Sequence, residues 1–286
     1  MPVVASACAL LAFLCIQPLG ALQWRVLLPS PRPSYARLLR IFSMASTANN
    51  GLNSVVGHAT GTALIANEAG VGAGTAVALL LLDQLVVALV KLVVFAVAIM
   101  TVWGRSVAIQ RWLTLAPLVG AVVALLCLVA LSRALSELPR GVPPWARRWL
   151  DPLHAALRDP RALRAVVRAL PIGLTIRLAE ALAVVAVQGA LGIPVAVTQL
   201  PLFLAATAFA TLLPVIPANL GTYEGALVAV YLFLGVPADR ALAAAALQHG
   251  CQLAAAITPG LVIGLMPLLR SLATRVRAAS QRGQND

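Results

Sequence analysis

Residues 44–74 read MASTANNGLNSVVGHATGTALIANEAGVGAG and include six glycines, four asparagines, His58 and Glu68. This stretch is too polar for a helix that faces lipid, yet a long apolar run at 76–103 follows it directly. Broken backbone at membrane depth is tolerated only where protein buries it or where it lines a wet cavity. The stretch therefore predicts a re-entrant pair of half-helices.

The composition places the whole chain in a membrane. Of 286 residues, 61% are hydrophobic and only 10% are charged, and the mean hydropathy is +0.93. Soluble domains contain roughly 45–50% apolar and about 25% charged residues. We expect a single integral membrane domain over residues 1–286, because one core in water cannot bury this much apolar surface.

The order of apolar runs predicts the fold. Five runs are long enough to span a bilayer, at 3–22, 76–103, 113–131, 169–197 and 241–269. A second interrupted region, 200–234, is expected to bend at Pro214, Pro217, Gly221 and Gly225. The predicted fold is all-α and polytopic, with about five full transmembrane helices and two re-entrant broken-helix hairpins.

Most of the charge lies between the spans. Twenty of the 21 basic residues are arginine, and the net charge is +12. If each interrupted region returns to the face it entered from, residues 25–40, 133–168 and the tail from Arg270 share one face and hold sixteen basic residues. Basic loops stay in the cytoplasm. We therefore expect a cell (inner or plasma) membrane protein with its N-terminus outside, its C-terminus cytoplasmic, and 133–168 as a basic cytoplasmic loop.

The same arginines could in principle bind nucleic acid. No groove-entering element stands outside the apolar runs, so no nucleic acid partner is expected.

The two interrupted regions resemble each other. The aligned pairs are Gly57 with Gly221, Gly61 with Gly225, Gly70 with Gly235, and Asp83-Gln84 with Gln248-His249. One copy would enter the membrane from inside and the other from outside, which is the pattern of an inverted-topology repeat with halves near 25–132 and 150–270. Glycine-rich membrane segments also align through composition alone, and the sequence leaves both interpretations open.

Eight ionisable side chains lie within or beside the apolar runs: His58, Glu68, Asp83, Lys91, Arg177, Glu180, Glu224 and His249. A charge at the bilayer centre costs roughly 2.5–3.5 kcal/mol, so each needs a cavity, a partner or the interface. Glu224 is either a headgroup or proton site, or a carboxylate that caps a half-helix. Arg177 either binds a lipid phosphate or pairs with Glu180 three residues later. Asn219 either lines a polar groove or caps a half-helix.

Motifs for catalysis and metal binding are missing from the sequence. It contains no G-x-S-x-G, H-E-x-x-H or P-loop pattern. The four cysteines have no C-x-x-C spacing, and two membrane-embedded histidines without a set of nearby carboxylates make a poor metal site. We expect no catalytic residues, no metal, no cofactor and no enzymatic activity.

Residues 213–225 read LPVIPANLGTYEG and continue as ALVAVYLFLGVPADRALAAAAL. Pro217, Gly221, Glu224 and the Gly-Val-Pro at 235–237 resemble a flippase-like membrane family, typified by the transmembrane region of lysylphosphatidylglycerol synthases. The resemblance is strongest over 152–266. On the helix after the first interrupted region, the family's acid-Arg pair is replaced by Asp83-Gln84.

The resemblance implies translocation or binding of a lipid or lipid-linked sugar. Glu224 and Arg177 would contact the headgroup, with Asp83, Glu180, His58 and Asn219 as further candidates. The expected partners are membrane lipids, anionic or sugar-linked, and an oligomer is compatible with this function. The alternative is a non-transporting scaffold or regulator of a cell-envelope lipid enzyme, acting through the basic loop. A lipid-modifying enzyme is a third hypothesis, which lacks a catalytic constellation.

Overall fold

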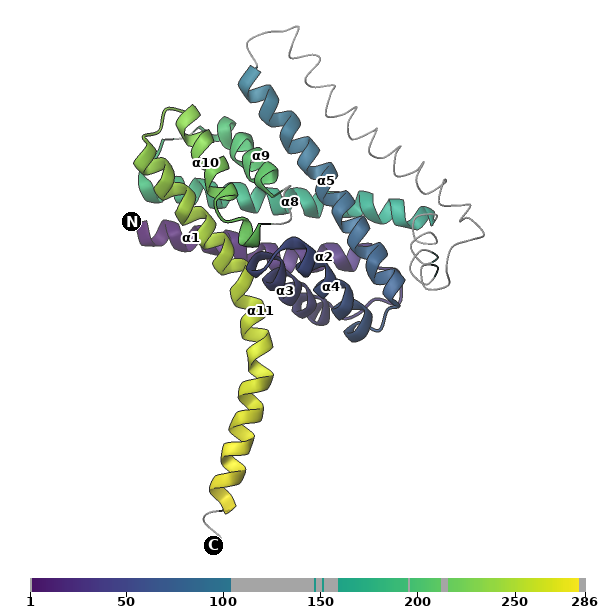
Figure 1. Cartoon of the computed structure of the whole chain (residues 1–286). Coiled ribbons are helices and arrows are strands. Elements are labelled where there is room, and N and C mark those ends of the chain that lie inside the picture. Colours follow the sequence, from purple (N-terminus) through teal and green to yellow (C-terminus); the bar gives the residue numbers. More distant parts are fainter. Residues whose placement is uncertain are drawn as a thin grey trace.

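The computed structural model of the chain describes residues 2–103, 147, 151, 159–194, 196–211 and 216–282, and every regular element among them is a helix (Figure 1). In chain order these are α1 (Pro2–Leu14), α2 (Ile16–Leu27), α3 (Tyr35–Gly51), α4 (Ser54–Glu68), α5 (Ala73–Trp103), α8 (Pro160–Leu191), α9 (Leu200–Ala210), α10 (Thr222–Phe233) and α11 (Ala238–Arg282), with 3-10 turns η1 (Val197–Gln199) and η2 (Pro217–Asn219). Within these residues, three stretches are long and apolar enough to cross a membrane: Val3–Leu27, Ala73–Thr101 and Arg161–Leu191. The chain is an all-α polytopic membrane protein, as the sequence predicts.

The helices differ from the predicted spans mainly at their ends. The first span continues beyond residue 22 to Leu27, with an interruption at Cys15 between α1 and α2. The arginines at 161, 164 and 168 belong to α8 itself, whereas the sequence predicts a span only from residue 169 and places them in the basic loop. Asp159 caps this helix by accepting from the Arg161 N–H at 2.8 Å, and Pro160 suits the first turn, so the span begins there. The run at 113–131 and most of the loop at 133–168 lie outside the described residues, and the run at 241–269 lies within α11.

The first interrupted region forms a helical hairpin of α3 and α4. The chain breaks at residues 52–53, where the Asn53 side chain accepts from the Val56 N–H at 2.9 Å and so caps α4. The two arms pack closely, since a Cβ on Gly57 would lie 2.5 Å from the Cα of Asn49. The hairpin is longer than the polar stretch that predicts it, because α3 already begins at Tyr35.

The second interrupted region forms a hairpin of α9 and α10. Its break contains Pro217 at the start of η2, and three residues with left-handed backbone: Ala218 and Asn219 (both φ 53°) and Gly221 (φ 82°). Gly225, expected in the bend, instead lies within α10, where its N–H donates to the Gly221 carbonyl in the first helical hydrogen bond. Pro214 lies outside the described residues.

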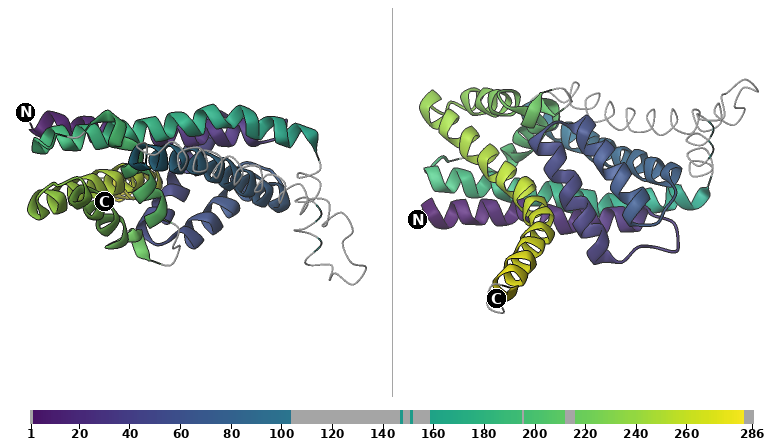
Figure 2. Two further views of the ribbon diagram at one scale, coloured as in Figure 1. Left: turned by 90° about the horizontal axis from the view of Figure 1, so that it is seen from above. Right: turned by 60° about the horizontal axis from the view of Figure 1, so that its bottom comes forward.

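Each hairpin packs against the long helix that follows the other hairpin. Helix α5, which follows the first hairpin, contacts α9 of the second, and α11, which follows the second hairpin, contacts α3 of the first. Helices α1 and α2 lie beside α8 and run in the opposite direction (Figures 1 and 2). Gly70 and Gly235, which the sequence pairs, both have positive φ (70° and 79°) just before the long helices. These contacts join the two hairpin regions, and the inverted repeat itself stays a prediction.

Helix α11 crosses α3 at a point of very close approach. A Cβ on Gly260 would meet the Thr47 hydroxyl and would lie 2.5 Å from the Ser43 carbonyl oxygen. Pro259 has no N–H to offer the carbonyl of Ala255, and Gln17 Nε2 donates to that carbonyl at 3.4 Å instead. The crossing thus ties α2, α3 and α11 together.

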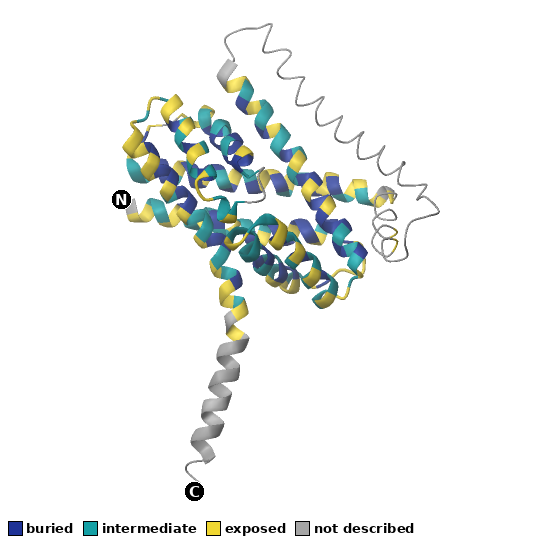
Figure 3. Cartoon of the chain, in the orientation of Figure 1, coloured by how far each residue is buried: buried dark blue, intermediate teal, exposed yellow. Residues whose placement is uncertain are grey.

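The buried residues, dark blue in Figure 3, concentrate where the helices pack together, and the apolar ones among them form two clusters. The first apolar cluster joins α1, the ends of α5 and α8, and the helices from α9 to α11, with Phe203, Leu227 and Tyr231 fully buried. The second apolar cluster joins α2, the first hairpin and the beginnings of α5 and α8, around residues such as Leu38 and Ile65. Polar side chains gather where the two clusters meet.

Candidate functional site

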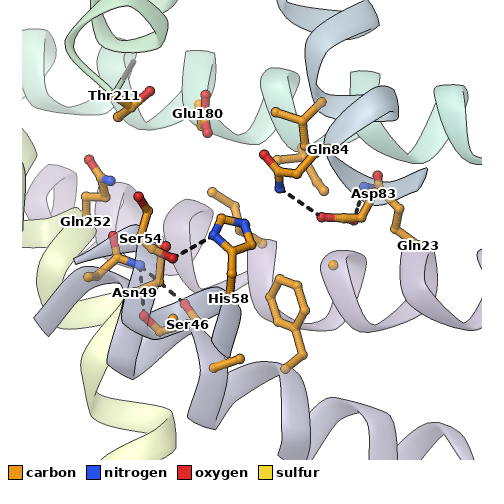
Figure 4. Close-up of a pocket in the computed structure, with 18 of the residues that line it drawn as sticks. Gln23, Ser46, Asn49, Ser54, His58, Asp83, Gln84, Glu180, Thr211 and Gln252 are labelled. Atoms are coloured by element: carbon orange, nitrogen blue, oxygen red, sulfur yellow. Dashed lines mark hydrogen bonds between the residues drawn. The ribbon is translucent and has the colours of Figure 1, made fainter. Parts of the chain in front are cut away.

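A cavity of about 330 Å³ lies where the two apolar clusters meet (Figure 4). Its walls come from α1, α2, α5 and α8 together with both hairpins. Side chains of the first hairpin and its break, among them Asn49, Ser54 and His58, lie across the cavity from Glu180 and Thr211. The cavity therefore draws on both halves of the chain.

The charged residues of the cavity lie midway along the spans. Asp83 and Lys91 occupy the middle third of the span Ala73–Thr101, and Arg177 and Glu180 occupy the middle third of Arg161–Leu191. Spans of this length match the thickness of a bilayer, so their centres lie near its midplane. Charged side chains at that depth mark functional pathways in membrane proteins.

Asp83 is held by two amides. It is 8% exposed and accepts from Gln23 Nε2 at 2.7 Å and from Gln84 Nε2 at 3.4 Å. Gln84 occupies the position of the arginine in the resembled family, so a neutral amide contacts the carboxylate there. A buried charge without a counter-ion needs such hydrogen bonds.

Arg177 and Glu180 form an ion pair within α8, with Nη1 and Oε2 2.6 Å apart. Their side chains are 18% and 20% exposed, and both line the cavity. Since a guanidinium has five donors, this pairing leaves donors of Arg177 for a second anion.

Lys91 gives the cavity a second cation. Its Nζ donates to the Thr211 hydroxyl at 3.1 Å, at the end of α9. Within the described part of the chain, no carboxylate oxygen lies within 4.0 Å of this ammonium. This ammonium is therefore available to bind an anionic group inside the cavity.

Of the remaining lipid-contact candidates, His58 and Asn219 line the cavity and Glu224 does not. His58 lines the cavity, where its Nδ1–H donates to the Ser54 carbonyl at 2.6 Å, and Asn219 lines it from the second break. Glu224 does not line the cavity. It accepts from the Gly221 N–H at 2.8 Å and lies 2.7 Å from His249 Nδ1, so it caps α10 and binds α11.

Of the six lipid-contact candidates, the cavity unites Arg177, Glu180, Asp83, His58 and Asn219. Reasoning from sequence left Gln23, Gln84 and Thr211 out and did not choose Lys91 for the site. Lys91 is the chain's one lysine and lies in an apolar run, and this position could have indicated a role in the site. Among the described residues, no three His, Cys, Asp or Glu side chains gather in a way that could hold a metal ion.

The fold and the cavity define a multi-pass α-helical membrane protein with a polar chamber at the middle of its spans. Residues 1–260 match the family described as the lysylphosphatidylglycerol synthase TM region, and the chain belongs to this family. The match extends beyond 152–266, where the resemblance is strongest, into the N-terminal half of the chain. No curated protein and no solved structure matches the chain. As a membrane protein, it contacts membrane lipids.

Proposed function

We propose that this chain translocates the headgroup of a phosphate-bearing lipid, either an anionic lipid or a lipid-linked sugar, across the inner membrane. The convergence of polar residues from the centres of α5 and α8 on one cavity carries the proposal. A polar headgroup crosses a bilayer readily only if protein groups replace its water near the midplane.

The size and chemistry of the cavity suit a headgroup rather than a whole lipid. Its volume of about 330 Å³ is near the lower end of the roughly 300–1,000 Å³ typical of small-molecule sites. Arg177 and Lys91 would bind the phosphate, while Asn49, Asn219 and Thr211 offer hydrogen bonds to hydroxyl groups. The acyl tails would stay in the bilayer, and no covalent chemistry is required.

The packing of each hairpin against the long helix that follows the other supports a transport mechanism. In transporters built from inverted repeats, one half rocks against the other around a central site, which opens to each side in turn. Here the cavity lies between a hairpin of each half, so such a motion would alter access to it.

The distribution of arginines supports the proposed orientation. Arg25 lies in the last turn of α2, and Arg161, Arg164 and Arg168 lie in the first turns of α8. These two ends share the second apolar cluster, so the arginines lie at the same end of the molecule. By the positive-inside rule this end would be cytoplasmic.

The test reconstitutes the purified chain in liposomes that contain fluorescent phosphatidylglycerol, phosphatidylethanolamine or a lipid-linked sugar, and measures movement by quenching the outer leaflet. Losing a hydrogen bond to a charged group costs about 1.5–3 kcal/mol, so we expect Arg177→Gln to slow translocation by about ten-fold or more. The double variant Arg177→Gln/Glu180→Gln removes the ion pair without leaving a lone carboxylate, and we expect it to stay slow.

Arg168→Gln is the matched control, because Arg168 is exposed on the same helix and does not line the cavity. We expect it to retain the native rate. Full recovery in the double variant would mean that Arg177 serves only to neutralise Glu180. Absence of movement for every lipid, together with copurification of a stoichiometric envelope enzyme, would favour the scaffold alternative.

A further inference from the structure

Glu224 and His249 form a pair outside the cavity that the proposed transport path does not use. His249, on α11, is 2% exposed, and its Nδ1 lies 2.7 Å from Oε1 of Glu224 at the start of α10. Its other ring nitrogen, Nε2, is buried and has no hydrogen-bond partner among the described residues. The ring stacks on Tyr223, with centroids 4.4 Å apart and planes at 21°.

This geometry leaves one proton-accepting atom. With Nδ1–H donating to the carboxylate, a neutral imidazole has a lone pair on Nε2. Addition of one proton there gives an imidazolium that faces Glu224, and the step requires no other reactant. A buried polar atom without a partner costs about 1–3 kcal/mol, so its presence in a native structure calls for an explanation.

The pair lies between the molecular surface and the cavity. The Glu224 side chain is 23% exposed, and Gly221 beside it is exposed, so a proton can reach the carboxylate through the break of the second hairpin. On the other side, Tyr223 covers His249 and also lines the cavity.

Few other charges act on this pair from the neighbouring helices. On α8, the Arg177–Glu180 pair acts electrostatically on Tyr223, whose ring stacks on that of His249. Helices α1 and α9 contain no Asp, Glu, Lys, Arg or His, and the charged residues of α3 lie in its first two turns. On α11 itself, Asp239 and Arg240 lie in the first turn, more than two turns from His249. Glu224 is therefore the direct ionic partner of His249.

We propose that Glu224 and His249 form a proton-binding site that controls the attachment of the second hairpin to α11. Protonation converts a hydrogen bond to a neutral ring into an ion pair, which holds the first turn of α10 more tightly. Glu224 also holds the Gly221 N–H, and Asn219, two residues earlier, lines the cavity. Proton binding thus acts on the cavity wall through the break, and only this coupling to transport rests on the proposed function.

Histidine NMR tests the proton site without reference to transport. In the full chain with isotope-labelled histidine in nanodiscs, the signal lost in His249→Asn identifies this residue among the three histidines. We expect that signal to show His249 gaining one proton as the pH falls, and Glu224→Gln to weaken that proton binding because the imidazolium loses its carboxylate partner. The proposal would be overturned if His249 kept a single protonation state from pH 5 to 9, or if Glu224→Gln left proton binding at His249 unchanged.

Translocation in liposomes tests the coupling. We expect the native rate to change at least five-fold across the pH range in which His249 titrates, and the rate of Glu224→Gln to be independent of pH. Glu68→Gln is the control, since Glu68 is also a helix-terminal acid but lies outside the cavity and pairs with Arg40. It should keep the native pH profile. A rate independent of pH despite a titrating His249 would refute the coupling, whereas no translocation by any protein would refute the proposed function alone.

Discussion

The close crossing of α3 and α11 can be tested directly by mutation. This crossing places the long helix after the second hairpin against the first hairpin. We predict that Gly260→Ala destabilises the protein strongly although it adds only one methyl group. The new Cβ would meet the Thr47 hydroxyl and would lie 2.5 Å from the Ser43 carbonyl oxygen. Ordinary C···O contacts are about 3.3–3.6 Å, so the two helices must separate by about 1 Å.

The cost has two parts. Overpacking of this kind costs about 1–3 kcal/mol. Separation also lengthens the hydrogen bond from Thr47 Oγ1 to the Ile257 carbonyl, now 3.0 Å, and interhelical bonds in membranes contribute about 0.6 kcal/mol on average, up to about 1.7. We therefore expect a loss of about 2–4 kcal/mol in the free energy of unfolding.

Reversible unfolding of the purified protein in mixed micelles measures this loss. Gly250→Ala and Gly264→Ala are matched controls on the same helix, since an added Cβ at either position meets nothing within 4 Å. Alanine has the higher helix propensity by about 1 kcal/mol, so these controls should be neutral or slightly stabilising. Thr47→Ala should relieve only part of the Gly260→Ala defect, because the Ser43 carbonyl remains. Equal stability of Gly260→Ala and the controls would refute the close crossing.

Two further predictions concern the first hairpin. Asn53→Ala should destabilise the protein by about 1 kcal/mol because α4 loses its N-cap, and Asn53→Ser should not; unfolding curves compare them, and equal losses would count against the cap. Glu68→Gln should change stability by less than about 1 kcal/mol, because its ion pair with Arg40 is well exposed; a double-mutant cycle with Arg40→Gln measures the coupling, and a value above about 2 kcal/mol would contradict this.

Local features made the helical architecture predictable. The breaks follow from residues with strong backbone preferences, such as Pro217 and Gly221, and apolar length marks α5 within three residues of its ends. The alignment of Gly70 with Gly235 also matches a shared left-handed turn. These signals depend on neighbouring residues, so a single sequence contains them.

Contacts between distant segments were not predictable. Asp83 accepts from Gln23, sixty residues earlier, and no local pattern indicates that pairing. From sequence alone, Glu224 has two possible roles, a headgroup or proton site and a carboxylate that caps a half-helix, and the structure shows that it caps α10. Its position on α10 turns it toward His249, and only the packing of α11 on α10 determines this. Periodicity identifies a helix but not the neighbour that each face meets.

The long helices that follow the two hairpins, α5 and α11, differ in chemistry at positions that the sequence alignment pairs. Counted from Gly70 and Gly235, Asp83 corresponds to Gln248, and Gln84 corresponds to His249. In the first half, the Gln84 amide donates to the Asp83 carboxylate beside the cavity. In the second half, the amide of Gln248 donates to the Tyr223 hydroxyl, and His249 meets Glu224.

Each long helix thus has two adjacent polar residues at the same distance from its start, but only on α11 does one of them, His249, meet a carboxylate through an imidazole. If a proton drives one hairpin against the other, this difference assigns the driven element to the second hairpin. The first hairpin is held to α11 by the Thr47 hydrogen bond and by close packing at Gly260, so it would stay fixed on α11 while the second hairpin moves.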